Sequence, residues 1–188
     1  INHSGKTNAY TVPDLNQQAN AFEEAINKAK IDPRTISYIE AQGTATPLGD
    51  NIEVTALSKT IKKYTKEKQF CSLGSVKTNI GHLEAAGGIS QLTKVLLQLK
   101  YKTLIPVQFA EKLNPDIDFE NSPFIVQREI AQWEPITLNT NGMKTTYPRR
   151  AVINSYGAGG TNVAVILEEF PNSNVSDNSN NDMSNIFV

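Results

Sequence analysis

The sequence contains few of the residues that build disulfides, metal sites and nucleic-acid interfaces. Its single cysteine, Cys71, excludes an internal disulfide and suits a reducing compartment, so we expect a cytoplasmic protein. Its two histidines, His3 and His82, fit no zinc-binding spacing, and we expect no metal site. The formal net charge is only −1, with charges of both signs dispersed along the chain, which argues against nucleic acid or a membrane as a partner.

Long hydrophobic runs are absent as well. No apolar stretch reaches the roughly 18 residues of a membrane-spanning helix, and no basic segment precedes an apolar one at the start of the sequence. With 188 residues, of which 39% are hydrophobic, the chain can bury the core of one domain. We therefore expect one globular domain that is neither exported nor inserted into a membrane.

The two ends of the sequence indicate a piece of a longer polypeptide. The chain opens at Ile1 without an initiator methionine, and residues 171–185 are rich in Asn, Ser and Asp. A segment with so few large apolar side chains cannot offset its ordering entropy. We expect a folded unit over residues 1–170, followed by a flexible linker over residues 171–188 that leads to a further domain.

Hydrophobic periodicity predicts alternating helices and strands in the first part of the chain. Residues 18–30 carry an apolar stripe at helical spacing, whereas residues 35–41 are dense in β-branched and aromatic side chains and predict a strand. Asp50 followed three positions later by Glu53 is a variant of the capping box, which predicts a second helix from Asp50 to about Tyr64.

Later segments complete the expected sheet. A helix over residues 82–99 has so many apolar positions that we expect it to be buried on most sides. Prolines after Pro106 indicate irregular, surface-wrapping structure. Further strands are expected at residues 70–76, 124–127 and 131–133, and as a hairpin at residues 150–169. Because strands and helices interleave, the fold class is α/β or α+β, with a mixed sheet covered by helices.

Two local features have plain structural interpretations. Cys71 lies in an apolar strand without a nearby base, so we interpret it as a buried thiol and not as a nucleophile. The segment 157–162 (GAGGTN) joins two strands and not a strand and a helix, which excludes a phosphate-binding loop. A tight hairpin is the favoured interpretation, and the alternative is a backbone whose N–H groups form an oxyanion hole.

Two other features point more strongly to chemistry. His82 follows Gly81 at the expected start of a helix, whose partial positive charge favours a neutral imidazole, and Lys77 either strengthens this effect or holds a water. The alternative for His82 is a satisfied capping residue. Within residues 42–50 (QGTATPLGD), we expect Gln42 to be exposed to a substrate, yet its amide neither takes up nor releases a proton at neutral pH.

The threonines of the same loop leave two interpretations open. Thr44 and Thr46 either bond backbone groups at the start of the following helix or line a channel for a polar, amide-bearing ligand. The loop alone does not distinguish between them.

In order and spacing, these loops resemble the C-terminal half of ketosynthase domains from modular polyketide synthases. The resemblance runs from Asn2 to about Phe170 and is carried by the segments YTVPDLNQQ, YIEAQGTATPLGDNIE, GSVKTNIGHLEAAGG, LIPVQFAEKLNPDIDFENSPFIV and RRAVINSYGAGGTNVAVILEE. It implies a thiolase-like α/β fold of two pseudo-equivalent halves, each a mixed five-stranded sheet packed by helices. This chain supplies the second half and requires the N-terminal half.

The resemblance also implies a reaction and its residues. In that family a cysteine on the first half accepts an acyl chain from the phosphopantetheine of an acyl carrier protein, so no cofactor is bound directly. Two histidines on the second half promote decarboxylation of an extender unit, and His82 matches one of them. Lys77 matches a supporting lysine and Ala158 an oxyanion-hole N–H. Thr44 and Thr46 match pantetheine contacts, and the same resemblance assigns Asn79, Gly157 and Gly159 to substrate binding.

Gln42 occupies the position of the family's first histidine. An amide donates a hydrogen bond there but exchanges no proton, and losing one positioned donor or acid costs about 10²–10³ in rate. We therefore predict a non-elongating ketosynthase that accepts an acyl chain and passes it on unchanged. Small Ala158, where relatives carry a bulky gate, and Val163–Ala164 depart from the family pattern and leave the pocket shape open.

Two alternatives differ in function from this acyl relay. One is a working β-ketoacyl synthase, in which Gln42 or a water replaces the histidine during decarboxylative condensation. The other is a docking or structural domain that performs no chemistry. In each case the resemblance implies a homodimer.

Overall fold

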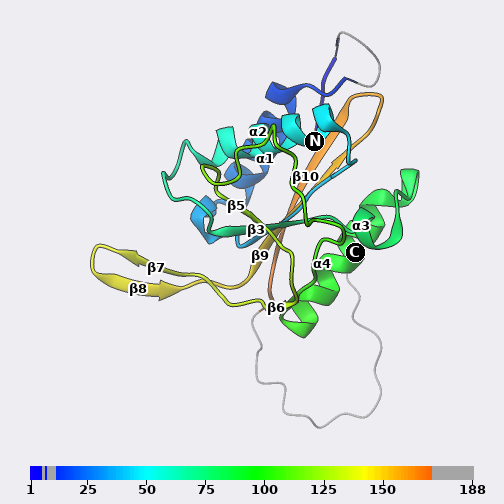
Figure 1. Cartoon of the computed structure of the whole chain (residues 1–188). Helices are drawn as coiled ribbons and strands as arrows, with labels where there is room; N and C mark the ends of the chain where they lie inside the picture. The colour runs from blue at the N-terminus through cyan, green and yellow to red at the C-terminus, as the bar shows by residue number, and fades with distance from the viewer. Residues whose placement is uncertain (6, 8–11, 171–188) are drawn as a thin grey trace, which may run out of the picture.

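The computed structural model describes residues 1–5, 7 and 12–170 (Figure 1). The predicted linker over residues 171–188 lies outside this part of the chain. The helices are α1 (Leu15–Ala29), α2 (Pro47–Ile61), α3 (Lys77–Ile80) and α4 (Gly87–Tyr101), with 3-10 turns at Pro33–Thr35 and Glu84–Ala86.

A mixed sheet of six strands forms the centre of the domain, in the order β1-β10-β9-β2-β3-β5. Strands β9, β2, β3 and β5 are parallel, whereas β10 runs antiparallel to both β9 and β1. The expected five strands are joined by a sixth, the two-residue β1. The strands are β1 (Asn2–His3), β2 (Tyr38–Glu40), β3 (Cys71–Gly74), β5 (Phe124–Val126), β9 (Arg150–Tyr156) and β10 (Thr161–Glu168).

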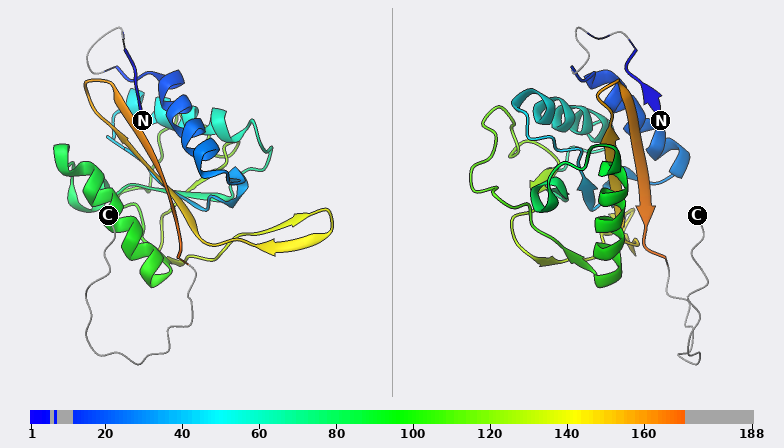
Figure 2. Two further views of the ribbon diagram at one scale, coloured as in Figure 1. Left: turned by 180° about the vertical axis from the view of Figure 1, so that it is seen from behind. Right: turned by 90° about the vertical axis from the view of Figure 1, so that its right-hand side faces the viewer.

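Helices cover both faces of this sheet. Figure 2 shows α1 and α2 packed on one face and α4 on the other. Phe22 and Ile26 of α1 and Leu57 of α2 are buried against Ile39 of the sheet. On the opposite face Val95 of α4 belongs to a second cluster, with Tyr38, Leu104, Trp133, Ala151 and Ile153. The predicted α/β class with a mixed sheet between helices is confirmed.

The start of α1 agrees with the sequence pattern and extends it. The carboxylate of Asp14 accepts hydrogen bonds from the backbone N–H groups of Asn16 (2.8 Å) and Gln17 (3.0 Å), so the helix begins at Leu15, three residues before the expected start. At the other end Lys30 adopts the left-handed conformation, with φ 54°, and closes the helix.

Two predicted boundaries are wrong. The strand expected at 35–41 shortens to β2, because Asp32 caps a 3-10 turn that ends at Thr35. The capping box at Asp50 and Glu53 does not form. Thr46 is the N-cap of α2, and Pro47, whose fixed φ suits a first helical position, starts the helix three residues before Asp50.

The irregular stretch after Pro106 contains more strands than expected. Alongside β6 (Ala131–Gln132), which pairs with β4 (Thr103–Leu104), strands β7 (Thr137–Thr140) and β8 (Met143–Thr146) form a hairpin that projects from the body (Figure 1). Its turn is Asn141-Gly142, both with positive φ, as a two-residue hairpin requires. This dipeptide was the available signal for the hairpin.

Candidate active site

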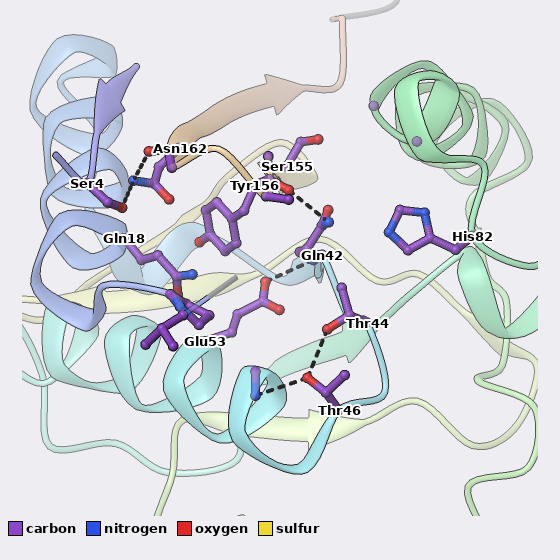
Figure 3. Close-up of a pocket in the computed structure, with 18 of the residues that line it drawn as sticks. Ser4, Gln18, Gln42, Thr44, Thr46, Glu53, His82, Ser155, Tyr156 and Asn162 are labelled. Carbon is purple, nitrogen blue, oxygen red and sulfur yellow. Dashed lines mark hydrogen bonds between the residues drawn. The ribbon is translucent and has the colours of Figure 1, made fainter. Parts of the chain in front are cut away.

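A pocket of about 810 Å³ opens where the ends of β2 and β9 meet the segment before α4. The close-up in Figure 3 shows Gln42 at its centre, His82 on one side and Tyr156 on the other. The pocket unites six of the residues expected in the site, namely Gln42, Thr44, Thr46, His82, Gly157 and Ala158.

Gln42 follows β2 and is held at both ends of its side-chain amide. Its Nε2 donates to the backbone carbonyl of Tyr156 at 3.0 Å, and its Oε1 accepts from the Lys77 ammonium at 3.3 Å. Only 9% of the residue is exposed, so the expectation of an exposed side chain is wrong. The reason is that α3 and the end of β9 close over the amide, although it still lines the pocket.

Glu53 of α2 fixes the backbone of the loop that carries Gln42. Its two carboxylate oxygens accept from the N–H groups of Gln42 (2.9 Å) and Gly43 (3.0 Å). Gly43 has φ +50° and a Cβ there would lie 2.8 Å from Ser75 Oγ, so glycine is required. Burial raises the pKa of Glu53 to about 7, although the two backbone N–H donors oppose this shift.

The backbone-bonding interpretation holds for Thr46, whereas among the described residues Thr44 Oγ1 contacts only the Thr46 hydroxyl. Thr46 Oγ1 accepts from the N–H of Gly49 at 3.1 Å and caps α2, and it lies 3.3 Å from Thr44 Oγ1. Both threonines also line the pocket. Asp50, expected to be the cap, accepts instead from the N–H of Ala45 at 3.2 Å.

His82 lies on the far wall of the pocket and is exposed. It does not begin a helix, because Gly81 (φ +81°) and Glu84 (φ +51°) have backbone conformations that are not helical. Helix α4 starts only at Gly87. Its Nδ1 accepts from the N–H of Glu84 at 2.9 Å. In the neutral ring the proton is therefore on Nε2, which is available as a hydrogen-bond donor.

Lys77, expected to support His82, contacts Gln42 instead. Burial lowers the pKa of this lysine, and the carboxylates of Glu53 and Glu40 oppose the shift. The helical turn α3 points the ammonium at the loop after β2, a placement that sequence spacing to His82 does not reveal.

Three further expectations concern residues outside the pocket lining. Asn79 donates to the carbonyl of Pro106 at 3.4 Å, and Gly159 is exposed in the β9–β10 turn. That turn is a tight hairpin connection, since Gly157 donates to the carbonyl of Thr161 at 2.8 Å. Cys71 is fully buried, and burial raises the pKa of its thiol, consistent with a structural role.

Sequence reasoning missed the wall of the pocket beside α1. Ser4, Gln18, Tyr156 and Asn162 line it, together with Glu53, which the sequence placed only in a helix cap. Gln18, Glu53, Tyr156 and Asn162 lie in segments that carry the family resemblance, but these segments are far apart in the sequence, and their spacing does not place the side chains together.

Across residues 1–5, 7 and 12–170, no three His, Cys, Asp or Glu side chains are grouped as a metal ion would need. Within the same residues, no helix has the length and apolar character to cross a membrane.

Comparisons with known proteins identify the fold. Residues 1–110 match the family model described as Beta-ketoacyl synthase, C-terminal domain. Polyketide synthases PksL and PksM of Bacillus subtilis (strain 168) are 53% and 54% identical over 170 residues, 90% of this chain but 4% of each relative. The chain thus spans a small fraction of these curated relatives.

Solved structures agree with this assignment. The ketosynthase from module 6 of the bacillaene synthase of Bacillus subtilis 168 superposes with a TM-score of 0.82 at 41% identity, covering 90% of this chain and 29% of that one. An oxazolomycin ketosynthase domain of Streptomcyes albus JA3453, OzmH KS7, gives 0.81 at 40% identity, covering 90% of this chain and 28% of that one. The chain belongs to the beta-ketoacyl synthase family and corresponds to the C-terminal half of a thiolase-like ketosynthase domain of a polyketide synthase.

Proposed function

We propose that this chain forms the second half of a non-elongating ketosynthase, which relays an acyl chain between carrier proteins. A cysteine on the N-terminal half would carry the chain as a thioester. The observation that supports the proposal is the carboxamide of Gln42 in the pocket that His82 lines, where the family pattern has an imidazole.

The contacts of Gln42 explain why condensation would fail. One N–H of its amide is directed to the Tyr156 carbonyl, and its oxygen is turned toward Lys77. The remaining N–H can donate a hydrogen bond to a developing oxyanion, but an amide transfers no proton near neutral pH. Decarboxylation and carbon–carbon bond formation, which need proton transfer and charge stabilisation, would therefore lose about 10²–10³ in rate.

The groups needed for acyl transfer are retained. His82 keeps Nε2 as a donor, and Ala158, an exposed residue that lines the pocket, can offer its backbone N–H to the thioester carbonyl. Thr44 and Thr46 form the wall along which a phosphopantetheine arm would enter. Transfer of the acyl group to a cysteine breaks one thioester and forms another, so no net proton donor is required.

The partners follow from this role and are part of the proposal. They are the N-terminal half of the same domain, acyl carrier proteins, and a second copy in a homodimer, with the whole assembly in the cytoplasm. Substrate arrives on the carrier's phosphopantetheine, so the domain itself needs no cofactor.

Intact-protein mass spectrometry of the complete ketosynthase domain tests the relay. The domain is incubated with an acyl carrier thioester and a malonyl carrier protein. We expect acylated ketosynthase and no product longer by two carbons. An extended product at an ordinary turnover rate would establish the elongating alternative, and failure of the domain to become acylated would establish the docking alternative.

A further inference from the structure

The wall of the pocket beside α1 ends in two buried polar atoms without partners. The hydroxyl of Tyr156 and Oε1 of Gln18 have no hydrogen-bond partner among the described residues. Gln18 is 97% buried, at 3% exposure, and both residues line the pocket. In Figure 3 the two side chains lie together on the α1 side of Gln42.

The other polar groups at this end of the pocket already have partners. Asn162 Nδ2 donates to Ser4 Oγ at 3.0 Å and to Asn2 Oδ1 at 3.1 Å. The carboxylate of Glu53 accepts from two backbone N–H groups. Among the described residues that line the pocket, the buried side-chain atoms left without a partner are the Tyr156 hydroxyl and the Gln18 carbonyl oxygen.

We propose that this end of the pocket, the Tyr156–Gln18 subsite, binds a hydroxyl group on the relayed acyl chain. A hydroxyl donates one hydrogen bond and accepts others, so it can donate to Gln18 Oε1 and accept from the Tyr156 hydroxyl. Leaving such groups buried and unpaired is costly, which a matching ligand relieves. This inference rests on the proposed relay function and names its substrate class.

Neighbouring chemistry argues against other substituents. An apolar chain would leave both polar atoms unpaired, which disfavours a fully reduced acyl group. Burial raises the pKa of Tyr156, and the nearby carboxylate of Glu53 raises it further. A carboxylate on the acyl chain would therefore be repelled by Glu53. A hydroxyl group is neutral and both donates and accepts hydrogen bonds, so it can pair with both polar atoms without repulsion from Glu53.

The test measures acylation of the complete ketosynthase domain by three matched N-acetylcysteamine thioesters: hexanoyl, 3-hydroxyhexanoyl and 5-hydroxyhexanoyl. Rates are read by intact-protein mass spectrometry. We expect at least one hydroxylated thioester to react about tenfold faster than hexanoyl, the effect of one well-placed hydrogen bond. Tyr156→Phe should reduce this ratio to about one or two, and Gln18→Leu should lower it in the same direction.

Tyr156→Phe removes only a hydroxyl that has no hydrogen-bond partner among the described residues, so it should not disturb the fold. Its melting temperature should not fall below that of the wild type. Tyr64→Phe, at an exposed residue after α2, is the matched control and should leave the rate ratio unchanged.

Two results would overturn the subsite: equal rates for all three thioesters in the wild type, or an unchanged preference in Tyr156→Phe. Neither result depends on chain extension. Extension is followed separately with a malonyl carrier protein, so failure of the subsite and failure of the relay are distinguishable.

Discussion

At the scale of single residues, the hydrogen bonds of Gln42 connect three elements around the pocket. Gln42 touches Tyr156 and Lys77 through its side chain and Glu53 through its backbone N–H. Glu53 is therefore a positioning residue, which holds the loop that carries Gln42 and Thr44. Its burial links the stability of the domain to pH.

We predict that Glu53 makes the domain less stable as pH rises. Burial raises the pKa of Glu53 from 4.5 to about 7, so the folded state holds this proton more tightly than the unfolded chain. The stability contributed by protonation is complete below about pH 4.5 and is lost by about pH 7. The loss amounts to roughly 3 kcal/mol by proton linkage.

Melting temperatures of the complete ketosynthase domain between pH 5 and 8 provide the measurement. Glu53→Gln cannot ionise, so its melting temperature should fall less with rising pH than that of the wild type. Identical pH dependence in the two proteins would show that Glu53 does not titrate in this range.

The sequence was more informative about which residues matter than about what they touch. The resemblance to ketosynthases implied that Gln42, Thr46 and His82 share one site, and the pocket contains all three. It assigned Lys77 to His82, because spacing along a chain says nothing about the direction in which a short helix points a side chain. Gln18 was missed, since α1 reaches the pocket only through packing on the sheet.

At the scale of elements, α4 buries several polar side chains beside Val95 and leaves several apolar side chains exposed. Its buried face carries Gln91, Lys94 and Gln98, whereas Ile89 and Leu96 are 61% and 50% exposed. The expected burial on most sides is therefore wrong for this chain, because no layer of the described structure covers the outer face. The polar inner face is anchored by a buried ion pair.

We predict that Lys94→Met destabilises the domain by about 3–5 kcal/mol. Lys94 Nζ lies 3.1 Å from a carboxylate oxygen of Glu40, and both side chains are almost fully buried. The substitution leaves the Glu40 charge in the core without its counter-ion, with the Tyr38 hydroxyl (2.6 Å) and the Val76 N–H as remaining donors. Urea unfolding measures the change in the free energy of unfolding.

The double variant Glu40→Gln/Lys94→Met separates charge from packing. Because it removes both ions, it should recover much of the stability lost in Lys94→Met. Lys100→Met, at an exposed position of the same helix, should change the free energy of unfolding by less than about 0.5 kcal/mol. Equal loss in the single and double variants would contradict the buried-charge explanation.

Helices with strong local signals were predictable, and elements that depend on distant contacts were not. Asp14 and the apolar stripe define α1 locally, and the Gly-rich turn defines the β9–β10 hairpin. The helix expected over 82–99 loses its first turn, because positive φ angles at Gly81 and Glu84 redirect the chain. Hydrophobic periodicity does not report backbone φ angles, so the sequence pattern did not indicate this change of direction.

At the scale of the whole molecule, the three layers leave one apolar face open. Figure 2 shows α4 as the outermost layer on its side of the sheet. Exposed apolar side chains occur on α4 and on the segment that precedes it, and they comprise Ile80, Leu83, Ile89, Leu96, Leu97 and Tyr101. A face of this composition matches a half-domain that packs on its other half.

We predict that residues 1–188 expressed alone self-associate. Contiguous apolar surface of more than a few hundred Å² is rare on soluble monomers, so the chain should elute as oligomers or aggregates. Size-exclusion chromatography with light scattering measures this. Coexpression with the N-terminal half should give a discrete complex, and the variant Ile89→Glu/Leu96→Glu should reduce self-association of the lone chain. A well-dispersed wild-type monomer would contradict the prediction.

In the proposed relay, the amide of Gln42 blocks condensation while acyl transfer continues. The most direct measurement compares the wild-type ketosynthase domain with Gln42→His, using one acyl carrier thioester and one malonyl carrier protein and counting the product longer by two carbons. We predict similar acylation in both proteins and an extension rate about 10²-fold higher with histidine. Ordinary extension by the wild type, unchanged by histidine, would contradict the account.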